Sequence, residues 1–342
     1  MNTLTSFPFS SALAGLLVCS LGAGAFAKTD LKADGRSLVG GQYQRAVEDR
    51  FDDALPLRGT AIKAWNAINL AVFGQANTEV IIAQDDWLFT AEEFRAPAAQ
   101  DDFEAELDTV LAALNARGIQ LVPLIVPDKA RVYSDKLAHE RATPLETRHD
   151  RVQEMLATRG LPNANLLTYL DQGRQRADTF MRTDTHWSPR GAEIAARAVA
   201  VAINDHTVAP SPFETRGFPI EDFVGDLMPF IDAGAFASWV GQDIEQIERF
   251  ETVSLGGAGG LLSEVSIPVA LVGTSFSARD DFNFAGFLQQ HTGLDLVNYA
   301  TEGQGPFAPM RDFLASDALE TSPPTIVVWE IPERYITLKE LP

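Results

Sequence analysis

Cysteine is nearly absent from the 342-residue chain: the single one, Cys19, lies in an apolar segment close to the N-terminus. Val18, which precedes it, is too large for a lipoprotein cleavage site. If this segment is removed on export, the remaining chain has no thiol. That excludes disulfide bonds, a cysteine nucleophile and thiolate metal sites from the mature protein.

Positive charge is also scarce, with 27 Lys and Arg side chains against 47 Asp and Glu and a formal net charge of −20. A nucleic-acid partner is excluded, because phosphate binding requires clustered basic side chains. Hydrophobic residues make up 46% of the chain and charged residues 22%, which excludes disorder and a multi-span membrane protein. The length allows one large α/β domain or two ordinary ones.

The N-terminus has the pattern of an export signal. Residues 1–27 contain no Asp, Glu, Lys or Arg, and 12–27 form an apolar stretch that is short for a bilayer span. This stretch ends in Ala25-Phe26-Ala27, a small–x–small triplet, so residues 1–27 are predicted to be a signal peptide. The alternatives are an uncleaved anchor or a buried helix, and the lack of a Lys or Arg before the apolar run departs from the signal pattern. We expect a periplasmic protein, held at the inner membrane if the segment stays uncleaved.

The rest of the chain alternates between apolar, β-branched runs and amphipathic stretches. Strands are expected at 79–83, 119–126, 165–170, 268–273, 294–300 and 325–331, and helices at 101–117, 144–159, 189–204, 282–290 and 307–316. This alternation predicts an α/β fold with a doubly wound, mostly parallel sheet. Residues 28–342 are predicted to form a single domain, with a loop-rich insertion around 206–265.

The first candidate site follows the expected strand at 268–273, where the sequence continues as Thr274-Ser275. Ligands of open parallel sheets bind outside the carboxyl ends of the strands. Gly273 permits a tight turn that displays Ser275 there, with backbone amides directed at an oxyanion on an attacked acyl carbon. The alternative is an ordinary turn with an N-capping serine, and Ser277 is a second N-cap candidate.

The second candidate is the pair Asp184 and His186, which lies just before a helix that Ser188-Pro189 is predicted to begin. A neutral imidazole can accept the proton of a serine, and a carboxylate on its other nitrogen fixes the tautomer. A lone loop histidine beside an N-capping carboxylate is the alternative. We expect no metal, because a metal site would need further His or carboxylate ligands.

The third candidate is the glycine-rich turn Gly303-Gln304-Gly305-Pro306 after the strand at 294–300. Glycine lets the backbone approach a ligand closely, and the Gly305 amide could contribute to an oxyanion hole. An ordinary strand-to-helix turn, with Pro306 opening the helix, fits the same residues.

Several motifs together resemble one family. They are Asp184–Ala192 (DTHWSPRGA), Val272–Ser277 (VGTSFS), Ala83–Phe89 (AQDDWLF), Val126–Ala130 (VPDKA), Gly303–Pro306 (GQGP) and Trp329–Tyr335 (WEIPERY). This set, in the order in which it runs along the chain over about residues 45–340, resembles the alginate O-acetyltransferase family of AlgJ and AlgX, within the SGNH-hydrolase-like superfamily. Its D-x-H block precedes its serine block, a circular permutation relative to ordinary SGNH esterases, and the order here agrees.

The resemblance implies Ser275 as nucleophile, His186 as general base and Asp184 as the residue that orients it. It implies a periplasmic O-acetyltransferase that works without cofactor or metal and acetylates alginate or a similar exopolysaccharide. A membrane-bound acyltransferase would supply the acetyl donor, and a polysaccharide export complex is a further expected partner. A carbohydrate acetyl-esterase with the same triad and a non-catalytic polysaccharide-binding scaffold stay open as alternatives.

Several side chains near these motifs are candidates for substrate contact. A chain with net charge −20 would repel a polyanion unless basic residues such as Arg182, Arg279 and Arg334 line the cleft. Trp187 is a candidate for stacking on a sugar ring, with a packing role as the alternative. Asp128 with Lys129, and Glu330 with Arg334, are expected to form structural ion pairs near the cleft.

Overall fold

The computed structural model describes residues 79–96, 102–162, 164–203, 210–231, 244–256 and 267–338, all within one compact unit. The predicted signal segment 1–27 lies outside these residues and stays a prediction. Within the described ranges, no helix combines the length and apolar character needed to cross a membrane.

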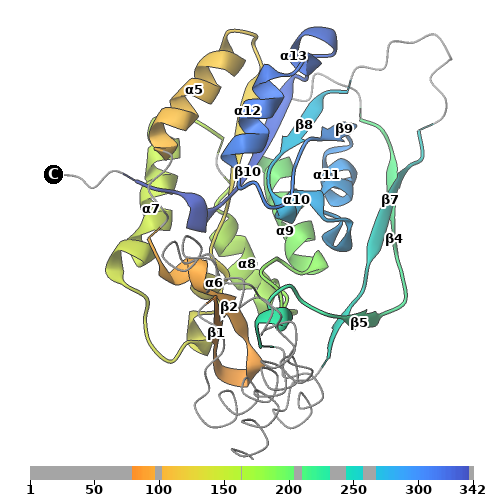
Figure 1. The fold of residues 1–342 in the computed structure, drawn as a ribbon. Helices are drawn as coiled ribbons and strands as arrows, with labels where there is room; N and C mark the ends of the chain where they lie inside the picture. Colours follow the sequence, from red (N-terminus) through yellow and green to blue (C-terminus); the bar gives the residue numbers. More distant parts are fainter. Residues whose placement is uncertain are drawn as a thin grey trace, which may run out of the picture. The chain divides into compact units, whose positions relative to one another are not determined.

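A parallel sheet with strand order β3-β10-β8-β9 forms the centre of the fold (Figure 1). Its strands are β3 (Gln120–Val126), β10 (Ile326–Pro332), β8 (Val269–Val272) and β9 (Leu296–Asn298). The register places Trp329 of β10 opposite Pro123 of β3 and Val272 of β8. Pro123 is tolerated because β3 is an edge strand. All residues of β8 and β10 are buried, which explains their continuous apolar sequence.

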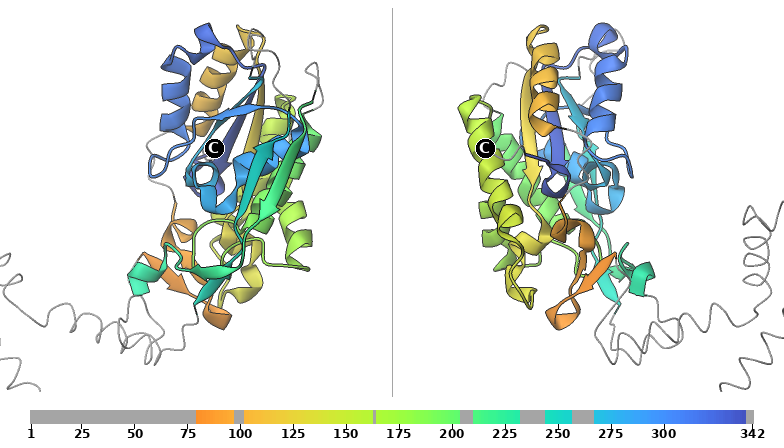
Figure 2. Two further views of the ribbon diagram at one scale, coloured as in Figure 1. Left: turned by 90° about the vertical axis from the view of Figure 1, so that its right-hand side faces the viewer. Right: turned by 60° about the vertical axis from the view of Figure 1, so that its left-hand side comes forward.

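Helices cover both faces of this sheet (Figures 1 and 2). One layer contains α5 (Phe103–Asn115), α7 (Thr143–Thr158), α12 (Phe307–Ala315) and α13 (Ala318–Thr321). The other contains α8 (Leu166–Arg174), α9 (Pro189–Ala202) and α11 (Phe284–Thr292). Successive residues of β3 alternate between the two layers: Leu121 and Ile125 pack with the first, Val122 and Leu124 with the second. The predicted doubly wound α/β fold is therefore confirmed.

One predicted element is wrong: residues 165–170 do not form a strand but begin α8. Leu166 and Leu170 are both fully buried, and four residues apart they lie on the same face of a helix. Asn165 begins the helix, because its side chain accepts a hydrogen bond from the Thr168 amide at 3.3 Å. The apolar run was therefore a helical stripe and not a strand.

The remaining elements are short. An antiparallel hairpin pairs β1 (Val80–Ile82) with β2 (Leu88–Thr90). Within 206–265, β4 (Phe213–Gly217) pairs with β7 (Phe250–Ser254), and β5 (Glu221–Phe223) with β6 (Glu245–Ile247). Short helices are α6 (Lys129–Val132) and α10 (Ser275–Ala278), and 3₁₀ turns are η1 (Gln84–Asp86), η2 (Ala91–Phe94), η3 (Ser134–Lys136), η4 (Met228–Ile231), η6 (Asp280–Phe282) and η7 (Glu333–Tyr335).

Candidate active site

Ser275 lies just beyond the carboxyl end of β8, where a two-residue turn leads into α10. The side chain of Thr274 caps this helix by accepting a hydrogen bond from the Phe276 amide at 3.3 Å. A Cβ on Gly273 would lie 2.5 Å from a carboxylate oxygen of Glu330, so only glycine fits this turn. The turn leaves Ser275 partly exposed, with its amide at the first position of the helix, where no intrahelical acceptor exists.

Glu330 of the neighbouring strand β10 holds this turn in place. Its carboxylate accepts hydrogen bonds from the Thr274 amide at 2.7 Å, the Thr274 hydroxyl at 3.0 Å and the Ser277 hydroxyl at 3.1 Å. Burial raises the pKa of Glu330, and these hydrogen bonds oppose the rise. Because Ser277 is 3% exposed and committed to Glu330, it is a poorer nucleophile candidate than Ser275.

His186 connects Ser275 to Asp184. Its Nε2 lies 2.7 Å from Ser275 Oγ, and its Nδ1 lies 2.6 Å from Asp184 Oδ1, which also accepts the His186 amide at 2.9 Å. Burial alone would raise the pKa of Asp184, but the hydrogen bond and charge of His186 hold it well below its usual range. The ionised carboxylate therefore accepts a hydrogen bond from Nδ1–H, which leaves Nε2 free of a proton and able to accept one from the serine hydroxyl.

The second oxygen of Asp184 is also bound. Asp184 Oδ2 accepts the Asp226 amide at 2.9 Å and Arg279 Nη1 at 3.3 Å. Arg279 lines a cavity of about 850 Å³ and forms a second ion pair with Asp281 at 2.6 Å. Asp184 is fully buried, and its two oxygens thus receive four N–H donors that hold it in one orientation.

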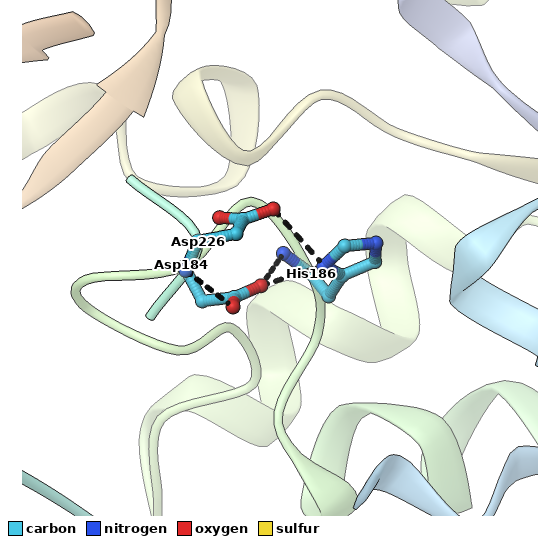
Figure 3. A group of neighbouring side chains, drawn as sticks. All are labelled: Asp184, His186 and Asp226. Carbon is cyan, nitrogen blue, oxygen red and sulfur yellow. Dashed lines mark hydrogen bonds and ion pairs between the residues drawn. The ribbon is translucent and has the colours of Figure 1, made fainter. Parts of the chain in front are cut away.

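Asp226 is a neighbour of the triad that the sequence analysis missed. Its Oδ1 accepts the Thr185 amide at 2.7 Å, and its Oδ2 lies 3.6 Å from His186 Nδ1. Figure 3 shows both carboxylates facing the same end of the imidazole ring. Burial raises the pKa of Asp226, and the charge of Asp184 raises it further. A Gly225-Asp226 dipeptide in a loop-rich segment carries no signal of this role.

Neither of the two expected ion pairs, Asp128 with Lys129 and Glu330 with Arg334, forms. Asp128 pairs with Arg141 at 2.8 Å and Arg148 at 2.7 Å and not with Lys129. Lys129 Nζ instead donates to three backbone carbonyls, of Leu88 at 2.5 Å, Arg182 at 3.0 Å and Asp184 at 2.9 Å. It therefore holds the loop that carries Asp184 against β2.

Arg334 likewise does not pair with Glu330, because the Glu330 carboxylate is occupied by Thr274 and Ser277. Arg334 Nε donates to Glu92 at 3.0 Å, and the side chain lines a second cavity of about 620 Å³. Gly305, with φ +66°, lines the same cavity. Its proposed oxyanion contact stays a prediction.

Arg182 contributes backbone groups to the loop before His186. Its amide donates to Glu245 of β6 at 2.5 Å, and its carbonyl accepts from the amide of Leu88 at 3.0 Å and from Lys129. These bonds fix the path of the loop from both sides. A contact of Arg182 with substrate stays a prediction.

Trp187 cannot stack on a sugar, because it is 0% exposed. Its ring packs against Phe276, with centroids 5.1 Å apart, and against Phe284 at 4.8 Å. The suggested role in substrate binding is therefore wrong, and Trp187 is a packing anchor. Because Trp187 packs against Phe276, the residue after Ser275, it holds the loop that carries His186 next to the serine.

The described residues include one group that could hold a cation: Asp184, His186 and Asp226, whose ligand atoms lie within 4.8 Å of one another. These are the atoms that already form the hydrogen bonds of the triad. A metal bound at Nδ1 would replace the Asp184–His186 bond and remove the tautomer control described above. The chemistry of this donor set therefore fits proton transfer better than metal binding.

The arrangement can perform acyl transfer. Nε2 of His186 can take the Ser275 proton as Oγ attacks an acyl carbon, and Asp184 stabilises the imidazolium that forms. The same imidazolium can then return the proton to a leaving group.

Comparison with known proteins agrees with this chemistry. Residues 80–333 match the family model described as SGNH hydrolase-like domain, acetyltransferase AlgX. The chain is 35% identical to the probable alginate O-acetylase AlgJ of Pseudomonas putida, over 99% of this chain and 91% of that protein. It is 34% identical to the same-named protein of Azotobacter vinelandii, over 99% of this chain and 90% of that one.

A solved structure shows the same fold. The O-acetyltransferase domain of Pseudomonas putida AlgJ superposes with a TM-score of 0.69 at 35% identity, covering 77% of this chain and 93% of that one. The family match and these relatives over nearly the full length lead to one conclusion: the chain belongs to the AlgJ and AlgX family of SGNH hydrolase-like O-acetyltransferases.

Proposed function

We propose that this acetyltransferase transfers acetyl groups to hydroxyls of alginate through an acetyl-serine at Ser275. The observation that carries the proposal is the continuous hydrogen-bond chain from Asp184 through His186 to Ser275, in a member of this family. Alginate is proposed as the acceptor because relatives of this chain are named alginate O-acetylase.

In the first half-reaction, Ser275 Oγ attacks the acetyl carbonyl of the donor while its proton moves to His186 Nε2. The tetrahedral intermediate collapses, and the donor's leaving group departs with that proton. In the second half-reaction, a sugar hydroxyl gives its proton to His186 and attacks the acetyl carbon. Ser275 Oγ then leaves and recovers the proton, so that both half-reactions balance without a cofactor.

We further propose that the reaction takes place in the periplasm, with a membrane-bound acyltransferase as donor of the acetyl group. The apolar segment 12–27 with its Ala25-Phe26-Ala27 triplet supports export to the periplasm. An assembly that exports the polysaccharide is a further expected partner, because a polymer acetylated in the periplasm still has to leave the cell.

The test uses the full-length protein with an aryl acetate as donor and a short alginate oligosaccharide as acceptor. We expect acetylated oligosaccharide in the mass spectrum, lost in Ser275→Ala and largely retained in the matched control Ser277→Ala. Brisk, Ser275-dependent donor hydrolysis with unmodified oligosaccharide would establish an esterase instead. Oligosaccharide binding with neither transfer nor hydrolysis would establish a scaffold.

A further inference from the structure

The cavity of about 620 Å³ lies between η2, the loop after β9 and η7. It opens at the same edge of the sheet as Ser275, because η7 directly follows β10 and the serine turn directly follows the adjacent parallel strand β8. The amide of Thr301, in the loop after β9, also donates to the carbonyl of Gly273 at 3.1 Å. The cavity and the serine turn are thus joined by backbone.

The cavity is rich in arginine although the protein is strongly acidic. Its lining includes three arginines, Arg95, Arg311 and Arg334, against a single carboxylate, Glu92. Each of these arginines also pairs with a carboxylate, so the cavity offers guanidinium N–H donors and no excess of positive charge. Arg95 and Arg311 pair with carboxylates that do not line the cavity, which fixes these two arginines at its rim.

Arg334 is the arginine built into the wall. It is 7% exposed, and its guanidinium lies over two rings, 5.5 Å from the centroid of Phe276 and 4.9 Å from that of Tyr335. Glu92 takes only its Nε–H. Among the described residues no partner takes its Nη groups, and a guanidinium presents these as a fork that fits a carboxylate.

We infer that this cavity binds the carboxylate of a uronate ring in the acceptor polysaccharide, with Arg334 as the residue that contacts it. The inference rests on the proposed function, because it concerns the acceptor of that reaction. Every ring of a polyuronate carries one carboxylate and at least one hydroxyl. Binding of the carboxylate would therefore restrict where the hydroxyl of the same ring lies relative to Ser275.

The neighbouring residues suit a sugar ring. Gly303 and Gly305 have positive φ angles and no side chain, and a Cβ on Gly303 would meet nothing within 4 Å. Tyr335 is partly exposed and lines the cavity beside Arg334, so its ring adds apolar surface that the buried Trp187 cannot. Arg334 also contacts Phe276, the residue after Ser275, so this wall of the cavity is packed against the serine turn.

Two measurements test the inference on the full-length protein. Binding of an alginate oligosaccharide and of its neutral methyl ester is measured by calorimetry with Ser275→Ala, which cannot turn over. Acetyl transfer to both acceptors is measured with active Ser275. We expect Arg334→Met to weaken binding of the acid about ten- to a hundred-fold and to leave the ester unchanged, as loss of a charged hydrogen-bond pair requires.

Arg334→Met removes a buried stacking partner, so Arg311→Met, at the exposed rim, serves as a variant that should fold normally. It should weaken binding of the acid by a smaller factor. Arg249→Met is the matched control, because Arg249 lines the other cavity and pairs with Glu221 and Asp281. This substitution should leave the binding of both the acid and the ester unchanged.

The outcomes separate the inference from the proposed function. Arg334-dependent binding without any transfer would support the uronate subsite and overturn the proposed function. Transfer that persists while Arg334→Met binds acid and ester as the parent does would overturn the subsite and leave the function standing. Equal weakening by Arg249→Met would also overturn the subsite.

Discussion

Asp184 and Asp226 are both close to His186, yet their surroundings shift their pKa values in opposite directions. Four N–H donors, one of them the imidazole Nδ1–H, keep Asp184 ionised despite its burial. Burial and the charge of Asp184 raise the pKa of Asp226, whose shortest contacts are to Thr185. The pair therefore divides into one carboxylate that orients the imidazole and one that orients the loop.

This division predicts unequal effects of two conservative substitutions. Asp184→Asn should lower kcat for aryl acetate hydrolysis by about 10⁴-fold, the loss seen when a triad carboxylate becomes an amide and the wrong tautomer is favoured. Asp226→Asn should lower kcat less than about tenfold, because an amide oxygen can still accept the Thr185 amide at the strength of an ordinary hydrogen bond. Equal losses in the two variants would assign orientation of the imidazole to both aspartates.

At the scale of elements, Lys129 joins three segments through one ammonium group. Its three N–H donors are matched by three carbonyls, one in β2 and two in the loop before His186. Burial lowers its pKa to about 8, against the attraction of the carboxylates of Glu93, Glu245, Asp184 and Asp226. A neutral amine has only two N–H groups, so deprotonation leaves one carbonyl without a donor.

Activity should therefore fall as the pH rises through about 8, the pKa of Lys129 in the folded protein. Because this pKa lies below that of an exposed lysine, the group contributes stability that is present above pH 10.5 and lost as the pH falls through 8. The alkaline loss of kcat should thus occur without unfolding. Fluorescence recorded with the kinetics checks this, Ser275→Ala supplies the blank, and Lys129→Met should lack the alkaline limb.

The turn after β8 is held in place by Glu330 of β10. Gly273→Ala would place a methyl group 2.5 Å from a Glu330 oxygen and 2.9 Å from its Cβ, so the turn must shift. We expect kcat for aryl acetate to fall at least about tenfold, because a displacement near 1 Å is costly at a reacting atom. Gly118→Ala, at φ +68° with nothing within 4 Å, is the control and should cost stability but not kcat. An active Gly273→Ala enzyme would contradict this account of the turn.

Local patterns in the sequence predicted most of these elements. Ser188-Pro189 begins α9 as expected, with the Ser188 hydroxyl accepting the Gly191 amide at 3.1 Å, and the apolar run of β3 is a buried strand. Residues 165–170 were misread because a short apolar run fits both a buried strand and one face of a helix. The Asn165 cap decided between them.

The site was predictable only in part, for a similar reason. The strand-end serine and the D-x-H loop made Ser275, His186 and Asp184 candidates, and the family resemblance implied their roles. The contact of Asp226 with Asp184 spans 42 residues and has no local signal. The burial of Trp187 depends on Phe276 and Phe284, which approach it only in the folded chain.

At the scale of the whole molecule, the net charge of −20 opposes the approach of a polyanionic acceptor. The arginines of the cavity of about 620 Å³ contact a ligand over a few ångströms. Repulsion by the net charge extends over the Debye length, which falls from about 30 Å at 0.01 M salt to about 10 Å at 0.1 M. Salt in this range therefore screens the repulsion more than it weakens contacts within the cavity.

The KM for an alginate oligosaccharide should consequently fall when salt is raised from about 0.01 M to about 0.1 M, because long-range repulsion is screened first. The KM for the neutral aryl acetate should stay constant, and so should that for the methyl-esterified oligosaccharide. The measurement is initial acetyl transfer at each salt concentration, with acceptor varied at fixed donor. A KM for the acid that rises steadily with salt would show that attraction to the arginines governs approach, and that the net charge of the chain does not.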